Sequence, residues 1–113
     1  MRFGHVNATE EQLWRWFTFP GTTCEVDLHL VTRDDLLSVK DAGNTALFAA
    51  HVAKVWFRDF KNCQDVNGVD IPNSELNRII MLQDLDFWNF IQAKLISSSN
   101  WRAEGKDDSG SAS

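Results

Sequence analysis

Cysteine and histidine are the residue types of this 113-residue chain that most readily do chemistry. Cys24 and Cys63 lie far apart and have no CxxC spacing, so two free thiols in a reducing compartment are the favoured interpretation, with one disulfide as the alternative. None of His5, His29 and His51 stands beside a second ligand at the spacing of a zinc motif. The sequence therefore predicts no metal site, and no oxyanion-loop signature accompanies either thiol.

Residues 65–70, Asp-Val-Asn-Gly-Val-Asp, have a faint calcium-loop pattern. An EF-hand loop that starts at Asp65 requires Gly at its sixth position and Glu at its twelfth. Asp70 and Leu76 occupy those positions. We therefore interpret the segment as a polar turn, because Asn67 and Gly68 both tolerate a positive φ.

Paired carboxylates, which could serve general acid–base catalysis, occur at Glu10-Glu11 and Asp34-Asp35. Both pairs stand where a helix is predicted to start, and the helix dipole favours negative charge there. The six glycines are scattered and form no phosphate-binding loop. The chain is therefore predicted to be no enzyme and to bind no cofactor.

Charge and hydropathy exclude two classes of partner. A formal net charge of -5 argues against nucleic acid, whose phosphates must be neutralised by Lys and Arg. The basic residues Lys54, Arg58 and Lys61 are interpreted as a solvated helix face. No segment approaches the roughly 20 apolar residues of a membrane span, and the N-terminal residues lack a signal-peptide pattern. The cytoplasm is the expected location.

The N-terminal part of the chain predicts a β-hairpin. Residues 13–19 are β-prone, Pro20-Gly21 marks a turn, and residues 24–31 alternate between apolar and polar side chains. Cys24, on the apolar face of the second strand, is expected to be buried.

Short helices are predicted to follow the hairpin. Residues 45–57 favour a helix, although the apolar cluster around Trp56 also fits a strand. Thr32 with Asp35 marks the start of one helix, which ends at Gly43-Asn44. Asn73 or Ser74 precedes a second helix over 75–83, and Asp84 or Asp86 precedes a third that reaches about 97.

The C-terminal residues differ in composition from the rest. Residues 99–113 are mostly small or charged and predict a disordered tail, with Trp101 as a lone anchor. Residues 1–98 predict one α+β domain, in which the N-terminal β-hairpin packs with three to four short helices.

The chain has 8 Phe and 5 Trp but no Tyr, more aromatic side chains than one small core obviously needs. Phe87, Trp88 and Phe90 are predicted not to face inward together with Ile91 on one helix. Some of the aromatic residues are therefore expected to meet a partner, because Trp is a common interface anchor, and a Trp-rich core is the alternative. The predicted partner-binding residues are Trp14, Trp16, Phe57, Phe87 and Trp88.

Several short motifs are spread over residues 14–95: Trp16–Pro20, Leu30–Arg33, Val52 and Val55-Trp56-Phe57 with Phe60, the turn at Asp65–Gly68, Ile71-Pro72, Ser74-Glu75-Leu76-Asn77 and Leu82. Together they resemble motifs of small tail assembly chaperones of long-tailed bacteriophages. The chain departs from the common pattern where Phe57-Arg58 stands in place of a Gly.

The resemblance implies a non-enzymatic role in the cytoplasm of an infected host cell. Such chaperones coat the apolar tape-measure protein and help to recruit tail-tube subunits. A structural virion component, such as a tail or head–tail connector subunit, is the first alternative, and an inhibitor or antitoxin-type binding module is the second. Association into a homo-oligomer is left open.

Overall fold

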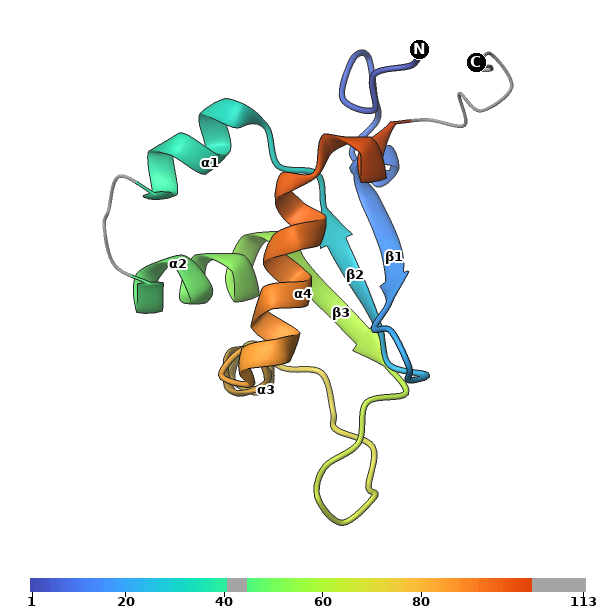
Figure 1. The fold of residues 1–113 in the computed structure, drawn as a ribbon, viewed down its shortest axis with the longest axis vertical. Helices are drawn as coiled ribbons and strands as arrows, with labels where there is room; N and C mark the ends of the chain where they lie inside the picture. The colour runs from blue at the N-terminus through green and yellow to red at the C-terminus, as the bar shows by residue number, and fades with distance from the viewer. Residues whose placement is uncertain (41–44, 103–113) are drawn as a thin grey trace.

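The structure is a computed structural model, and it describes residues 1–40 and 45–102. Its centre is a three-stranded antiparallel sheet in the order β1-β2-β3 (Figure 1). The α+β class predicted from the sequence is confirmed. The strands are β1 (Trp14–Thr18), β2 (Glu25–His29) and β3 (Phe57–Lys61), and the helices are α1 (Arg33–Lys40), α2 (Thr45–His51), α3 (Glu75–Met81) and α4 (Leu85–Ile96).

The predicted hairpin is confirmed as β1 and β2. Trp16 lies opposite Asp27, and the Phe19 amide donates to the Cys24 carbonyl at 2.8 Å where the strands close. Gly21 has a φ of 78°, a conformation that residues with a side chain rarely adopt. Pro20 followed by Gly21 is the sequence expected for a type II turn. Local turn chemistry thus sets the register of the hairpin.

Residues 45–61 combine the two structures considered for this segment. Helix α2 continues into a π-helical turn at Val52–Trp56 and then directly into β3. The helix predicted over 45–57 is therefore wrong at its end, where Phe57 belongs to the strand. The reason is a β-bulge, seen as a register shift between Asp27 and Leu28. The bulge lets Phe57 and Phe60 both face the core and so removes the alternation that identifies a strand.

Capping side chains start three of the helices as the sequence predicted. Before α1, the Asp35 amide donates to Thr32 Oγ1 at 3.2 Å, and the Thr32 amide donates to Asp35 Oδ2 at 3.3 Å, so the capping box is complete. Ser74 caps α3, and Asp84 caps α4. The predicted helix end at Gly43-Asn44 lies outside the described residues.

Helix α4 covers one face of the sheet and crosses in front of it in Figure 1. It buries four apolar side chains, because the sheet lies against one side of the helix and α2 against another. Phe87 packs on Phe19 with ring centroids 5.6 Å apart, and Trp88 packs on Phe48 of α2 at 5.4 Å. The prediction that Phe87, Trp88, Phe90 and Ile91 could not all face inward is therefore wrong: three are buried and Phe90 packs partly buried against the core.

The chain remains ordered beyond the predicted domain end at residue 98. A 3-10 turn, Ser98–Trp101, places Trp101 in the core with 1% of its surface exposed. Its indole donates to the Lys94 carbonyl at 3.0 Å and its ring packs edge-on against Phe17. The tail predicted over 99–113 is thus wrong for 99–102, because a buried Trp holds this segment, and residues 103–113 lie outside the described part.

A disulfide joins Cys24 and Cys63, with Cα atoms 4.8 Å apart, and corrects the expectation of free thiols. Glu25 pairs with Lys61 across β2 and β3, so the residues flanking this pair are brought together by the sheet. Cys24 and Cys63 are far apart in the sequence, and they come close only because β3 pairs with β2.

Removing the disulfide is expected to lower the free energy of unfolding by about 2–4 kcal/mol, because the crosslink restricts the unfolded chain. Urea denaturation of the oxidised protein and of a Cys24→Ala/Cys63→Ala variant, each with and without reductant, measures the effect. Reductant should lower the wild-type midpoint and leave the variant unchanged. Two alkylatable thiols in the denatured, unreduced wild type would contradict the crosslink.

Candidate functional site

The face of the sheet opposite α4 carries polar and aromatic side chains and is the candidate site. We call it the open face. Its members come from all three strands, and they alternate with the core residues along β1 and β2, while the bulge interrupts the alternation in β3. They are Trp14 and Trp16 of β1, Glu25, Asp27 and His29 of β2, and Arg58 and Lys61 of β3.

Arg58 ties the open face together. Its Nε donates to Asp27 Oδ2 at 2.6 Å, and its terminal nitrogens donate to both carboxylate oxygens of Glu11, at 3.2 and 2.9 Å. Its guanidinium also stacks on the Trp14 ring, 4.2 Å from the centroid. A planar guanidinium can form a paired hydrogen bond and a stacked contact at the same time. Arg58 therefore holds the three strands and the N-terminal 3-10 turn (Glu11–Leu13) in one arrangement.

Asp27 is the buried partner in this cluster, with only 3% of its surface exposed. Its Oδ1 has no hydrogen-bond partner among the described residues, so Arg58 is the group that compensates the carboxylate. A buried charge left without its partner is strongly destabilising. The burial of Asp27 therefore makes the position of Arg58 a structural requirement.

The same cluster shifts the pKa of two groups. Hydrogen bonds from Arg58, and then its charge, lower the pKa of Glu11 from its ordinary 4.5. Glu11 therefore contributes stability above the ordinary Glu pKa, and this is lost as the pH falls through the lower folded-state value. Hydrogen bonds to Glu11 and then to Asp27 raise the pKa of Arg58, so its cation persists at every pH at which the fold does.

His29 and Glu10 extend the cluster along the hairpin. Glu10 Oε2 lies 3.1 Å from Trp14 Nε1, which donates to it, and 3.2 Å from His29 Nε2. His29 Nδ1 lies 2.6 Å from the Leu30 carbonyl, and the ring meets Trp14 edge-on. Because both nitrogens face acceptors, both hydrogen bonds form together only when the imidazole carries two protons.

Trp16 is the exposed aromatic group of the open face. Of the five tryptophans, all within the described residues, it alone is exposed, at 42%. Lys61 Nζ lies over its ring at 4.5 Å from the centroid and 3.8 Å from Glu25 Oε1. The indole is thus held on the sheet with one face toward a cation and much of its area toward solvent.

The structure divides the five predicted partner-binding residues into two groups. Trp14 and Trp16 lie together on the open face. Phe57, Phe87 and Trp88 are buried in the core, so they do not line the surface of the described chain. The partner-binding role stays a prediction for Trp14 and Trp16, while the Trp-rich core left as the alternative accounts for the other three.

Sequence reasoning missed Glu11, Asp27 and Arg58 as one cluster. Lys54, Arg58 and Lys61 were expected on one helix face, but β3 places Arg58 and Lys61 on the open face. The available signal was Asp27, a carboxylate between two apolar neighbours in a strand. A buried carboxylate there requires a cation from elsewhere in the chain.

The Asp65 side chain organises the turn over residues 65–70. Asp65 Oδ1 accepts the amides of Asn67 at 2.8 Å and Val69 at 3.0 Å, and Gly68 has a φ of 76°. The polar-turn interpretation is confirmed. Within residues 1–40 and 45–102, no group of three or more His, Cys, Asp or Glu side chains is placed to hold a metal ion.

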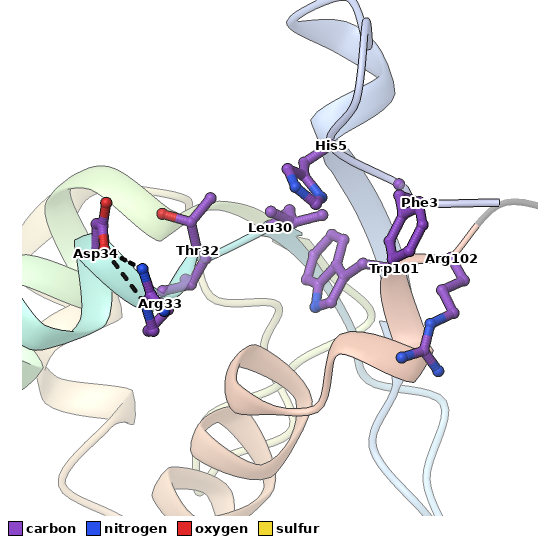
Figure 2. A pocket seen from close by; sticks show the side chains of 10 residues that line it. Phe3, His5, Leu30, Thr32, Arg33, Asp34, Trp101 and Arg102 are labelled. Carbon is purple, nitrogen blue, oxygen red and sulfur yellow. Dashed lines mark hydrogen bonds and ion pairs between the residues drawn. The ribbon is translucent and has the colours of Figure 1, made fainter. Parts of the chain in front are cut away.

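A shallow cleft of about 580 Å³ lies between the N-terminal segment and the start of α1. Figure 2 shows His5 and Phe3 at one end, beside Trp101, and the Arg33–Asp34 pair at the other. Arg33 Nε and Asp34 Oδ1 lie 3.4 Å apart, so these charges compensate each other. The Asp34 carboxylate and the His5 imidazole lie at opposite ends of the cleft.

The helices of the described residues include none long and apolar enough to cross a membrane. Comparison with models of known families, with curated protein sequences and with solved structures finds no match to the chain. The open face and its edges therefore have to be interpreted from their own chemistry.

Replacing Arg58 with Met is expected to lower the free energy of unfolding by about 3–5 kcal/mol, because Asp27 is left buried and uncompensated. Lys61→Met, which breaks a solvent-accessible pair on the same strand, should cost about 1 kcal/mol or less. Denaturant unfolding compares the two variants.

An Arg58→Met/Asp27→Asn double variant is the control for charge. It should be more stable than Arg58→Met alone, because no ion remains buried. Equal destabilisation by Arg58→Met and Lys61→Met would contradict the role assigned to Arg58.

Proposed function

We propose that this chain is a non-enzymatic protein-binding module, and that it works as a phage tail assembly chaperone. In this role it binds a tape-measure protein and helps to recruit tail-tube subunits. The observation that carries the binding proposal is the open face, where Trp16 is exposed beside Trp14 on a rigid, ion-paired sheet.

The geometry of the open face suits a protein partner. Trp contributes large contact area with few side-chain rotations, and such residues often anchor interfaces. Arg58 and Lys61 hold Trp14 and Trp16 in place, so little order has to be gained on binding. The carboxylates around them and the net charge of -5 favour solubility of a complex with an apolar partner.

The motifs behind the chaperone resemblance have structural roles in this fold. Trp56, Phe57 and Phe60 are buried, and Ser74 caps α3. These residues serve the core and a helix cap in this chain, and the open face is the surface proposed to bind the partner. The tape-measure and tail-tube proteins are proposed as partners because of the sequence resemblance.

The disulfide favours a second candidate, a structural virion component such as a tail or connector subunit. Disulfides persist outside the reducing cytoplasm, including on virions. Cys24 and Cys63 are joined in this structure, and a chaperone that acts in the host cytoplasm would meet reducing conditions.

Mass spectrometry of purified virions separates the two candidates. A chaperone is expected to be absent from mature particles and present in infected-cell lysate. A stoichiometric amount of this chain in the particle, with Cys24 and Cys63 oxidised, would contradict the chaperone and support the virion component.

The Trp16→Ala variant should lose binding to a co-expressed tape-measure fragment while its free energy of unfolding changes by about 1 kcal/mol or less. Trp88→Ala should instead cost about 3–5 kcal/mol because it opens the core. Val66→Ala, which shortens an exposed apolar side chain on the distant loop, is the matched surface control. Co-purification and fragment solubility are the readouts, and unchanged capture by Trp16→Ala would refute the open face as the site.

A further inference from the structure

We infer that the free edge of β1 is a self-association site, at which a second copy of this chain adds its own β1 in antiparallel orientation. The inference rests on the backbone of β1 and does not depend on the proposed function. It concerns the rim of the sheet, although pairing there also brings Trp14 and Trp16, which belong to the open face, to the border between the two copies.

The hydrogen-bond pattern of the hairpin shows which backbone groups point outward. The Phe19 amide donates to the Cys24 carbonyl, and the Leu30 amide donates to the Leu13 carbonyl. Hydrogen-bonded and non-hydrogen-bonded pairs alternate along an antiparallel ladder. Leu13 and Phe19 are in hydrogen-bonded pairs, so Trp14, Trp16 and Thr18 are in non-hydrogen-bonded pairs and direct their backbone groups away from β2.

These outward groups are unpaired within the described residues. The Trp14 amide donates to the Glu11 carbonyl, so at Trp14 only the carbonyl remains available for pairing. Trp16 and Thr18 present both N–H and C=O without a backbone or side-chain partner in residues 1–40 and 45–102. Figure 1 shows β1 at the right-hand side of the sheet with no described element beyond it.

The opposite edge of the sheet is protected. Asn73 Nδ2 donates to the Arg58 carbonyl at 2.9 Å, and the Phe60 amide donates to Asp59 Oδ1 at 2.7 Å. The bulge opposite Asp27 further distorts this edge. Natural sheets block edges by such devices, whereas β1 carries no proline, bulge or lysine, and its one charged residue, Arg15, is engaged by the Asn100 and Arg102 carbonyls.

One open and one protected edge specify the occupant and the size of the assembly. Two copies that pair through β1 close both open edges and leave only protected ones, so the sheet stops growing at a dimer. A two-fold axis beside Trp16 makes this contact isologous and aligns the whole of both strands. Each Trp16 amide then donates to the Trp16 carbonyl of the other copy. Each Thr18 amide donates to the Trp14 carbonyl of the other copy.

The side chains are compatible with this pairing on both faces. On the open face, Trp16 meets its own copy, and Trp14 lies opposite Thr18. On the face toward α4, Arg15 lies opposite Phe17, and its charge is already engaged by the Asn100 and Arg102 carbonyls at 3.2 and 3.0 Å. Aromatic cross-strand neighbours stabilise such pairs, and no like charges face each other directly.

The test uses a proline that removes an outward N–H and leaves the hairpin ladder intact. The molar mass of the full chain is measured by light scattering and sedimentation over a wide concentration range. We expect a concentration-dependent dimer for the wild type and for Thr18→Ala, which keeps the amide. Thr18→Pro should remain a monomer with an unchanged far-ultraviolet dichroism spectrum and an intact disulfide.

The Trp16→Cys variant tests the register without relying on proline. Mild oxidation should join two copies through position 16, because in this register the two residues lie directly opposite each other. A wild type that stays monomeric at high concentration overturns the inference, as does a dimer that Thr18→Pro leaves unchanged. Dimers joined only through other surfaces, with no crosslink at position 16, also overturn it.

Discussion

The ion pair between buried Asp27 and the partly exposed Arg58 is the interaction on which the rest of the structure depends. A bulge in β3 turns Arg58 to the open face while Phe57 and Phe60 stay in the core. From there the guanidinium reaches Glu11 and Trp14, so it joins the N-terminal turn and all three strands. The Arg58 carbonyl is in turn held by Asn73, which also accepts from Arg78 of α3. Loss of the pair would therefore disturb both layers of the fold.

The two faces of the sheet have different physical tasks. The face toward α4 is filled by aromatic and aliphatic side chains, and most of the stability that hydrophobic burial supplies arises there. The open face carries fixed charges with Trp16 exposed among them. Among the residues that the structure describes, the outward backbone groups of Trp16 and Thr18 at the β1 rim are unpaired, whereas the rim at β3 is protected. Binding properties therefore gather on one side of the molecule, and the disulfide at the end of β3 fixes that side to the hairpin.

Local features of the fold were predictable from the sequence, and features that depend on β3 were not. The hairpin, the Pro20-Gly21 turn and the helix N-caps follow from neighbouring residues. The bulge removes the alternating pattern by which β3 could have been predicted. Without β3, neither the disulfide nor the Asp27–Arg58 pair could be predicted, because each joins residues far apart in the chain. The segment around Trp101 was predicted as a tail because its surroundings are polar, and the prediction of Trp101 as an anchor is confirmed by its burial. The partner-binding prediction grouped Trp14 and Trp16 with Trp88, because nothing local in the sequence distinguishes a sheet-surface Trp from a core Trp.

Exchange of the Arg58 Nε proton with solvent, followed by nuclear magnetic resonance in the unmodified protein, tests the central claim most directly. A guanidinium fixed between Asp27, Glu11 and the Trp14 ring should give a resolved Nε resonance that exchanges far more slowly than those of exposed arginines such as Arg33. The amides of β2 that face β3 should be protected to the same extent as those that face β1, since the sheet opens as one unit. An Arg58 signal that exchanges as fast as that of Arg33, with β3 opening independently of the hairpin, would contradict the account.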